Sequence, residues 1–415
     1  MNKLKIIYSI AILGLGSLHV FSQSYLFKTG KADSLYSEIL QEKRNIWIEY
    51  PKNFNPESSK EYPVVYILDG ETQLRALDAV YTYYEGHFLP EMILVGISNT
   101  DSRMRDLTTS EVKMRYGWPV NEETGGAEAF TRFLEFELFP YIDSILPATS
   151  YRTLIGHSFG GLFTINTFLN HSHLFSNYMA IDPSLDWDDQ RLLDHSRAKL
   201  QETDLSKNAL FVSLSAASLH MQDESVTMEN LMTDTSEYTL FARSIVEFSK
   251  LAETQEQNGL IFSWKYYPND IHGTVTLPTI RDGLISMFDW YQLESFWKFN
   301  DFETPTNELM KLVQYREEKL KDNFGYTVPP FDEELFNMMG YMSLESGQPD
   351  KSKAFFEMGI QYFPESPNAY DSMADYYISQ NDIENALLNL RKAYGLSGSV
   401  LYLNKIEKID KGGIK

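Results

Sequence analysis

Short apolar runs alternate with helical patterns over residues 35–290, and this alternation constrains the fold more than any other feature of the sequence. Several runs are apolar throughout, as strands covered on both faces usually are. Strands that alternate with helices predict a mostly parallel sheet with right-handed crossovers, and the first two runs are close enough to form an antiparallel edge instead. The strand-like runs are 44–50, 64–68, 92–97, 152–155, 178–181, 209–214 and 261–267, and the main helical patterns are 127–145, 162–169, 238–253 and 279–291.

The chain beyond residue 297 has no strand-like run and contains a repeat with a period of 34 residues. The recurring positions are Phe336, Met339, Gly340 and Phe356 in the first copy and Tyr370, Met373, Ala374 and Leu390 in the second. Small residues beside large ones at this period resemble the tetratricopeptide repeat, in which paired helices cross closely. We expect a helical connector at 297–330, two degenerate repeats at 331–400 and a tail at 401–415, with an ordinary helical bundle as the alternative to repeats. Two repeats are few for a long groove, so a docking or lid role competes with peptide capture.

Charge and composition exclude several classes of function. The chain carries 36 Lys and Arg against 58 Asp and Glu, a formal charge of −22. This acidic excess argues against nucleic acid or an anionic membrane as a partner, because both need a cationic surface, and it disfavours strongly anionic substrates. The absence of cysteine excludes disulfides, thiolate zinc sites, iron–sulfur clusters and a cysteine nucleophile.

The first residues have the pattern of an export signal. Lys3 and Lys5 precede an apolar run over 6–18, and Val20-Phe21-Ser22 offers a cleavage site before Gln23. The run is shorter than the roughly 20 residues of a membrane span. We therefore expect a signal peptide at 1–22 that is cleaved, with an uncleaved anchor as the alternative. The mature protein is then periplasmic or secreted and has no membrane span.

The segment Gly156-His157-Ser158-Phe159-Gly160-Gly161 has the context of a nucleophile elbow, because a strand-like run precedes it and a helical pattern follows it. The sharp turn exposes the Ser158 hydroxyl above the sheet, while Gly156 and Gly160 leave room for close packing of helix on strand. The Phe159 N–H, at the positive end of the helix, is placed to stabilise an oxyanion. The pattern predicts Ser158 as a nucleophile.

Of the eight histidines, His272 has the context of a general base. It follows the last strand-like run, near the end of the α/β region, as expected where the nucleophile comes first in the chain. His157 flanks the nucleophile, and we expect it to pack. His171 and His173 form a pair without a third ligand, which favours a surface helix terminus over a metal site.

The catalytic acid is expected after the run 209–214, where a carboxylate can hold the tautomer of the imidazole. Asp223, Glu224 and Asp234 lie between that run and the next helical pattern. We select Asp234, with Asp223 and Glu224 as alternatives. The competing interpretation is a helix N-cap for Asp234 and a solvated loop for the other two.

A second oxyanion donor is expected after the run 64–68, where Asp69-Gly70-Glu71 follows. Glycine lets the backbone approach a ligand closely, so the N–H of Gly70 or Glu71 is the candidate, and a plain strand-to-helix turn is the alternative. Trp187 lies either in the substrate pocket or in the core. The sequence has no phosphate loop or dinucleotide fingerprint, and we expect no metal and no cofactor.

These segments resemble, in order, the signatures of the esterase family that includes esterase D, bacterial siderophore esterases, feruloyl esterases and mycolyltransferases. The matching segments are 62–70, 97–101, 156–161, 182–185 and 272–273. The resemblance spans about residues 35–295 and implies an α/β-hydrolase fold with serine-dependent acyl transfer, usually to water. It implies Ser158 as nucleophile, His272 as base and 69–71 as oxyanion loop. The stretch 215–237 is longer than the family pattern, which leaves the acid open.

Taken together, the sequence predicts an exported serine esterase with an α/β-hydrolase domain at 23–296, a mostly parallel sheet covered by helices, and a C-terminal all-α repeat domain. Its expected substrate is a small-molecule or glycan-linked ester, and the C-terminal repeats are expected to offer a site for a protein partner. One alternative is an acyltransferase that uses the same residues. The other is a catalytically inert interaction protein, which a reactive Ser158 would exclude.

Overall fold

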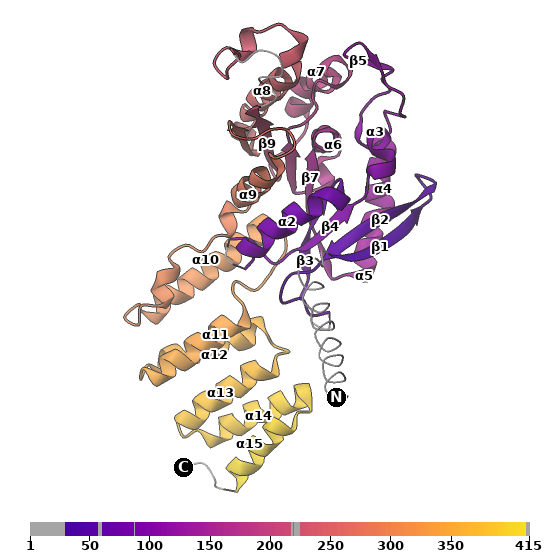
Figure 1. The fold of residues 1–415 in the computed structure, drawn as a ribbon. Helices are drawn as coiled ribbons and strands as arrows, with labels where there is room; N and C mark the ends of the chain where they lie inside the picture. Colours follow the sequence, from indigo (N-terminus) through magenta and orange to yellow (C-terminus); the bar gives the residue numbers. More distant parts are fainter. Residues whose placement is uncertain (1–29, 57–59, 87, 217–218, 220–224, 412–415) are drawn as a thin grey trace, which may run out of the picture. The chain divides into compact units, whose positions relative to one another are not determined.

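The computed structural model describes residues 30–56, 60–86, 88–216, 219 and 225–411 (Figure 1). The chain divides into two compact units between Gln292 and Leu293. The predicted signal peptide at 1–22 and the alternative acids Asp223 and Glu224 lie outside the described residues. None of the helices in the described ranges combines the length and the apolar character needed to cross a membrane.

The first unit is built on an eight-stranded sheet with the order β1-β2-β4-β3-β7-β8-β9-β10. Neighbours from β4 onwards in this order pair in parallel, whereas β2 pairs antiparallel with both β1 and β4. The strands are β1 Lys31–Ser37, β2 Glu42–Glu49, β3 Tyr62–Ile67, β4 Ile93–Ile97, β7 Ala148–His157, β8 Asn177–Ile181, β9 Ala209–Ser215 and β10 Ile261–Tyr267. A separate hairpin consists of β5 Met114–Arg115 and β6 Trp118–Pro119.

Helices cover both faces of this sheet. The Tyr178 ring on β8 contacts Phe168 on α6, whereas its neighbour Met179 meets Gly283 on α9. Because successive side chains of a strand point to opposite faces, α6 and α9 lie on opposite sides of the sheet. The helices of this unit are α2 Gly70–Tyr84, α3 Arg103–Leu107, α4 Ala127–Phe133, α5 Phe139–Ile145, α6 Phe159–Asn170, α7 Trp187–Glu202, α8 Leu240–Glu253 and α9 Thr276–Met287.

The predicted mostly parallel sheet covered by helices is confirmed, and each of the seven predicted runs is a strand. The strands β3, β4, β8 and β9 are buried along their whole length, which explains their continuously apolar sequences. Strand β1 was not predicted. Its sequence is mostly polar because it lies at the edge of the sheet, where six of its seven residues are exposed or partly exposed.

Parallel strands end at one edge of a sheet, and ligands bind there in open α/β folds. Asp69 follows β3, Ser158 follows β7 and Asp182 follows β8, while His272 lies in the loop between β10 and α9. The topology therefore brings residues far apart in sequence to a single edge.

The second unit is entirely helical over its described residues. Its helices are α10 Thr306–Phe324, α11 Glu333–Glu345, α12 Pro349–Tyr362, α13 Pro367–Ser379, α14 Ile383–Ser397 and α15 Val400–Asp410. The expected connector, 297–330, holds α10, whose Leu309 joins a buried cluster with Phe336 and Phe355. The expected tail, 401–415, holds most of α15, whose Ile406 packs with Leu390. The tetratricopeptide assignment itself remains a prediction.

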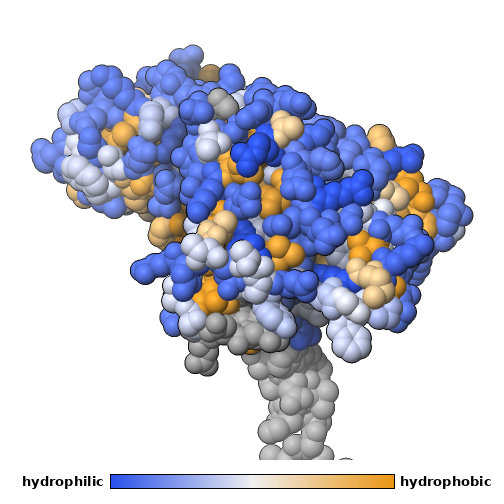
Figure 2. All heavy atoms as spheres, turned by 90° about the horizontal axis from the view of Figure 1, so that it is seen from above, coloured by the Kyte–Doolittle hydropathy of each residue, from blue (hydrophilic) through white to orange (hydrophobic). Residues whose placement is uncertain are grey.

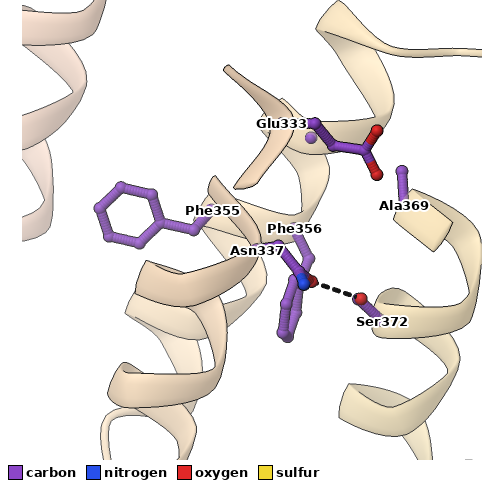
Figure 3. Close-up of a pocket in the computed structure, with 7 residues that line it drawn as sticks. Glu333, Asn337, Phe355, Phe356, Ala369 and Ser372 are labelled. Carbon is purple, nitrogen blue, oxygen red and sulfur yellow. Dashed lines mark hydrogen bonds between the residues drawn. The ribbon is translucent and has the colours of Figure 1, made fainter. Parts of the chain in front are cut away.

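A close helix crossing explains the small residue at one repeat position. A Cβ at Gly340 of α11 would lie 2.3 Å from the ring of Phe356 on α12. Beside the crossing, a cavity of about 10 Å³, room for one water, is lined by Glu333, Asn337, Phe355, Phe356, Gly359, Ala369 and Ser372 (Figure 3). The Ser372 hydroxyl donates a hydrogen bond to the Asn337 side chain across it. This cavity is a packing gap and is too small for an organic ligand.

We predict that Gly340→Ala destabilises the second unit by about 1–3 kcal/mol, because the added methyl group overpacks the crossing. Gly395→Ala in α14 is the matched control, since its new Cβ meets nothing within 4 Å. The control should be neutral or more stable by about 0.5–1 kcal/mol, as helix propensity favours alanine. Calorimetric unfolding measures both. Equal stability of the two variants would show that the helices do not cross closely at Gly340.

Candidate active site

Ser158 lies in a strained turn between β7 and α6. Its backbone angles are φ 60 and ψ −113, a conformation that L-residues rarely adopt. The turn is held from the neighbouring strand, because Ser158 N–H donates to Ile181 O at 2.9 Å and Ser184 N–H donates to Ser158 O at 3.1 Å. A Cβ at Gly156 would lie 2.1 Å from Gly160 O, so only glycine fits there. This is the geometry of a nucleophile elbow.

His272 is held by a buried carboxylate. Its Nδ1 lies 2.7 Å from Asp182 Oδ2, and the Asp182 carboxylate also accepts from Ser215 N–H at 2.9 Å and from the Ser215 hydroxyl at 2.7 Å. Because the carboxylate is an acceptor, Nδ1 of His272 carries the hydrogen and Nε2 is left as a base. The His272 side chain is 42% exposed, whereas Asp182 is fully buried. The partly exposed imidazole of His272 can therefore take a proton from a group outside the protein core.

The selection of Asp234 as the partner of His272 is wrong in this structure. The Asp234 carboxylate instead accepts from Ser236 N–H at 2.7 Å and the Thr239 hydroxyl at 2.9 Å, just before α8. The Ser236 hydrogen bonds hold the pKa of Asp234 below its usual value. Asp234 thus holds a local turn before α8, although it is not the N-cap residue of that helix, which is Thr239.

The carboxylate that contacts His272 follows β8, one strand earlier than expected. Asp182 has φ 44, a left-handed backbone conformation. Its carboxylate accepts a hydrogen bond from Ser215 at the end of β9. The sequence does hold a signal: Asp182 is the first residue after an apolar strand, as Ser158 is after its own. It was overlooked because chain order alone does not say which loop reaches the base.

The predicted oxyanion donors lie at two helix N-termini. Phe159 is the first residue of α6, and Gly70 and Glu71 begin α2. The first N–H groups of a helix have no acceptor within the helix. The two N-termini are adjacent, because a Cβ at Gly160 would lie 3.8 Å from Asp69 Oδ2. This placement supports the predicted roles of all three residues.

Trp187 packs in the core against Phe159, the residue that follows Ser158. Its ring is 1% exposed, packs edge-on against Phe159 and donates from Nε1 to Ser110 O at 3.3 Å. A buried ring of this kind belongs to the core and does not line an open pocket. The β5–β6 hairpin also packs against Phe159, because the guanidinium of Arg115 on β5 lies 5.1 Å from the Phe159 ring centroid. The same guanidinium pairs with Asp186 at 2.6 Å.

The outer side of the hairpin faces solvent, where the Trp118 residue is 76% exposed. The molecular surface seen in Figure 2 is mostly hydrophilic, with hydrophobic residues gathered in separate patches. A hydrophilic surface agrees with the acidic composition of the chain.

His157 contacts the loop that carries the base. Its Nε2 lies 2.8 Å from the backbone oxygen of His272, and the two imidazole rings are 4.4 Å apart. A carbonyl oxygen can only accept, so Nε2 of His157 carries the hydrogen. Burial, and then the charge of His272, lower the pKa of His157 to about 4 from 6.5. The sequence suggested only packing for His157, and this hydrogen bond was not anticipated.

No hydrogen bond joins Ser158 and His272 among the described side chains, and the Ser158 Oγ lies 3.3 Å from the Oγ of buried Ser184 instead. Nucleophile and base often come within hydrogen-bonding distance only when substrate is bound. The other two histidines of interest lie apart from the site, where His171 contacts Glu128 and His173 contacts Glu135.

Comparison with known proteins identifies relatives of the first unit. The model of the family described as "Putative esterase" matches residues 37–246, more than half of the chain, a range that includes Ser158 and Asp182 but not His272. Ferri-bacillibactin esterase BesA of Bacillus subtilis is 29% identical over 46% of this chain and 71% of its own length. The siderophore enterobactin esterase of Emericella nidulans is 30% identical over 34% of this chain, but only 52% of its own length is covered.

Solved structures share the fold. An IroE-like serine hydrolase from Shewanella oneidensis has a TM-score of 0.64 and 26% identity, over 80% of this chain and 99% of its own. An uncharacterised protein from Capnocytophaga ochracea has a TM-score of 0.57 and 17% identity, over 92% of this chain and 99% of its own. The predicted α/β-hydrolase fold is thereby confirmed.

We predict that His157 makes the protein less stable in mild acid. Its pKa is about 4 when folded and 6.5 when free, so protons bind preferentially to the unfolded state. The stability that a neutral His157 contributes is complete above pH 6.5 and is lost as the pH falls towards 4. In His157→Gln, whose amide can still donate to His272 O, the melting temperature should fall less between pH 7.5 and pH 4.5.

His173→Gln is the control, because this histidine is exposed and its loss should leave the acid-dependent fall unchanged. An equal fall in wild type and His157→Gln would contradict the proposed neutral state of His157.

Proposed function

Because the chain belongs to the "Putative esterase" family, we propose that it hydrolyses carboxylic esters through an acyl-enzyme on Ser158. The observation that carries this proposal is that three groups lie at one edge of the sheet. They are Ser158 in its strained turn, the partly exposed His272, and the buried Asp182 that is hydrogen-bonded to His272. Family membership supports ester hydrolysis, and the geometry supports the serine mechanism.

In the proposed first step the Ser158 Oγ attacks the ester carbonyl carbon while His272 Nε2 takes the hydroxyl proton. The negative charge moves to the carbonyl oxygen, where the N–H of Phe159 and that of Gly70 or Glu71 stabilise it. The C–O bond to the alcohol then breaks, and His272 returns its proton to the leaving oxygen. Asp182 stabilises the imidazolium between these two events.

In the second step water attacks the acyl carbon of the ester on Ser158, and His272 Nε2 takes the proton of the water. The bond to Ser158 Oγ breaks, the proton returns to that oxygen, and the carboxylic acid leaves. The balance is one ester and one water consumed for one acid and one alcohol released.

The substrates that we propose are siderophore esters. The relatives support this class, since their names include a ferri-bacillibactin esterase, a siderophore enterobactin esterase and an apo-salmochelin esterase. The first of these is covered over 71% of its length and the other two over about half, so substrate identity is inferred from the matched region.

We predict that a fluorophosphonate labels Ser158 and that Ser158→Ala loses almost all hydrolysis of p-nitrophenyl butyrate and of enterobactin. Removal of the nucleophile leaves only residual catalysis over water, about 10³–10⁴-fold. Mass spectrometry of the labelled peptide locates the serine, with denatured wild-type protein as the control. Wild-type turnover by Ser158→Ala, or a label on another serine, would refute the mechanism. Cleavage of p-nitrophenyl butyrate with enterobactin left intact would refute the substrate class alone.

We predict that Asp182→Asn lowers kcat by up to about 10⁴-fold, because an amide in place of the carboxylate favours the wrong tautomer of His272. Asparagine tolerates the left-handed backbone at this position, so the fold should be kept. Asp234→Asn is the matched control and should keep the wild-type kcat. A large loss of kcat in the control, with Asp182→Asn still active, would restore Asp234 as the acid.

A further inference from the structure

Arg103 of α3 contacts each segment that surrounds the proposed oxyanion site. Its Nε lies 2.8 Å from Asp69 Oδ1, and its Nη2 lies 2.9 Å from Asp69 Oδ2 and 3.1 Å from the backbone oxygen of His157. Its guanidinium also lies 5.5 Å from the centroid of the Phe159 ring. One side chain thus joins the loop before α2 to the turn before α6.

Asp69 is an N-cap residue whose side chain does not cap. It immediately precedes α2 and has φ 52, yet its carboxylate makes no hydrogen bond to the first turn of that helix. Aspartate at an N-cap ordinarily accepts a hydrogen bond from the second or third N–H of its helix. Here both carboxylate oxygens are taken by Arg103 in a bidentate pair, the strongest form of carboxylate hydrogen bonding.

This arrangement matters because the first N–H groups of α2 are the proposed donors to the oxyanion. A carboxylate that turned back onto α2 would accept from the N–H of Glu71 or Thr72, and Glu71 would then be lost as a donor to the oxyanion. It would also place a negative charge beside the negative charge that develops on the substrate, which is unfavourable. Asp69 is 6% exposed, so without Arg103 its charge would be buried and unpaired, and the helix N-terminus would be its nearest source of donors.

We propose that Arg103 is a positioning residue that holds the Asp69 carboxylate away from the N-terminus of α2 and so leaves the Glu71 N–H free to bind the oxyanion. The proposal rests on the esterase function proposed above. The hydrogen bond from Arg103 to His157 O also fixes this loop relative to Ser158, the next residue in the chain. One guanidinium therefore contacts Asp69 itself and the residue that precedes Ser158, and both Asp69 and Ser158 have positive φ.

The test compares Arg103→Met, Arg103→Met with Asp69→Asn, and Arg105→Lys, using p-nitrophenyl butyrate as a neutral substrate. A neutral substrate removes any effect of the Arg103 charge on substrate binding. Arg105 lies on the same short helix and pairs with Glu42 and Asp106, so its variant controls for damage to α3. Melting temperature reports whether each variant is folded.

In Arg103→Met we expect kcat to fall by about 10- to 100-fold with little change in KM, because oxyanion donors act in the transition state alone. The double variant should recover part of that kcat, because Asp69→Asn removes the misplaced negative charge. Arg105→Lys should keep the wild-type kcat even if it melts earlier. A purely structural role for Arg103 would make the double variant no better than the single one.

Three results would overturn the proposal: a wild-type kcat in Arg103→Met, an equal loss of kcat in Arg105→Lys, or a double variant no more active than Arg103→Met. Should Arg103→Met fail to fold, Arg103→Lys replaces it, because lysine keeps the charge but cannot form the bidentate pair with Asp69. A folded Arg103→Lys with wild-type kcat would then overturn the proposal. An inactive wild-type protein would refute the esterase function instead, which separates the two failures.

Discussion

The left-handed backbone of three non-glycine residues at one sheet edge is the constraint on which the site depends. Asp69, Ser158 and Asp182 have φ values of 52, 60 and 44, and each follows a parallel strand of the central sheet. Such conformations are costly and persist only where the surroundings over-determine them. Buried strands on either side supply that rigidity, and the strained turns direct the Ser158 hydroxyl and the two carboxylates out of the sheet edge.

The side chains at this edge form one connected set of hydrogen bonds. Asp182 holds the imidazole of His272, the imidazole of His157 holds the backbone of His272, and Arg103 holds the backbone of His157. Through Arg103 the set continues to Asp69 and the start of α2. Nucleophile, base and oxyanion loop come from different parts of the chain, and these contacts fix their relative positions. The pKa of His157, lowered by burial, keeps its ring neutral beside an imidazole that must become charged.

Local patterns in the sequence were sufficient for the fold class, for Ser158 and for the region of His272. A strand, a glycine-flanked turn and a helix are contiguous, so the elbow can be recognised without knowledge of the tertiary structure. The contact of Asp182 with His272 was not predicted, because it depends on which loop reaches the imidazole across two neighbouring strands. Arg103 was missed for the same reason, since its role lies in contacts with residues far away in the chain. In the second unit, Gly340, a small residue at a recurring position of the 34-residue period, does lie where α11 and α12 come close.

The central claim is that the ester is cut through a covalent intermediate on Ser158. Rapid quenching of the reaction with p-nitrophenyl butyrate, followed by mass spectrometry of the peptides, measures that intermediate directly. The account predicts a butyryl group on the peptide that contains Ser158 during the first turnover, formed as p-nitrophenol is released in a burst. Steady release of p-nitrophenol with no acylated peptide, or acylation of a different residue, would contradict it.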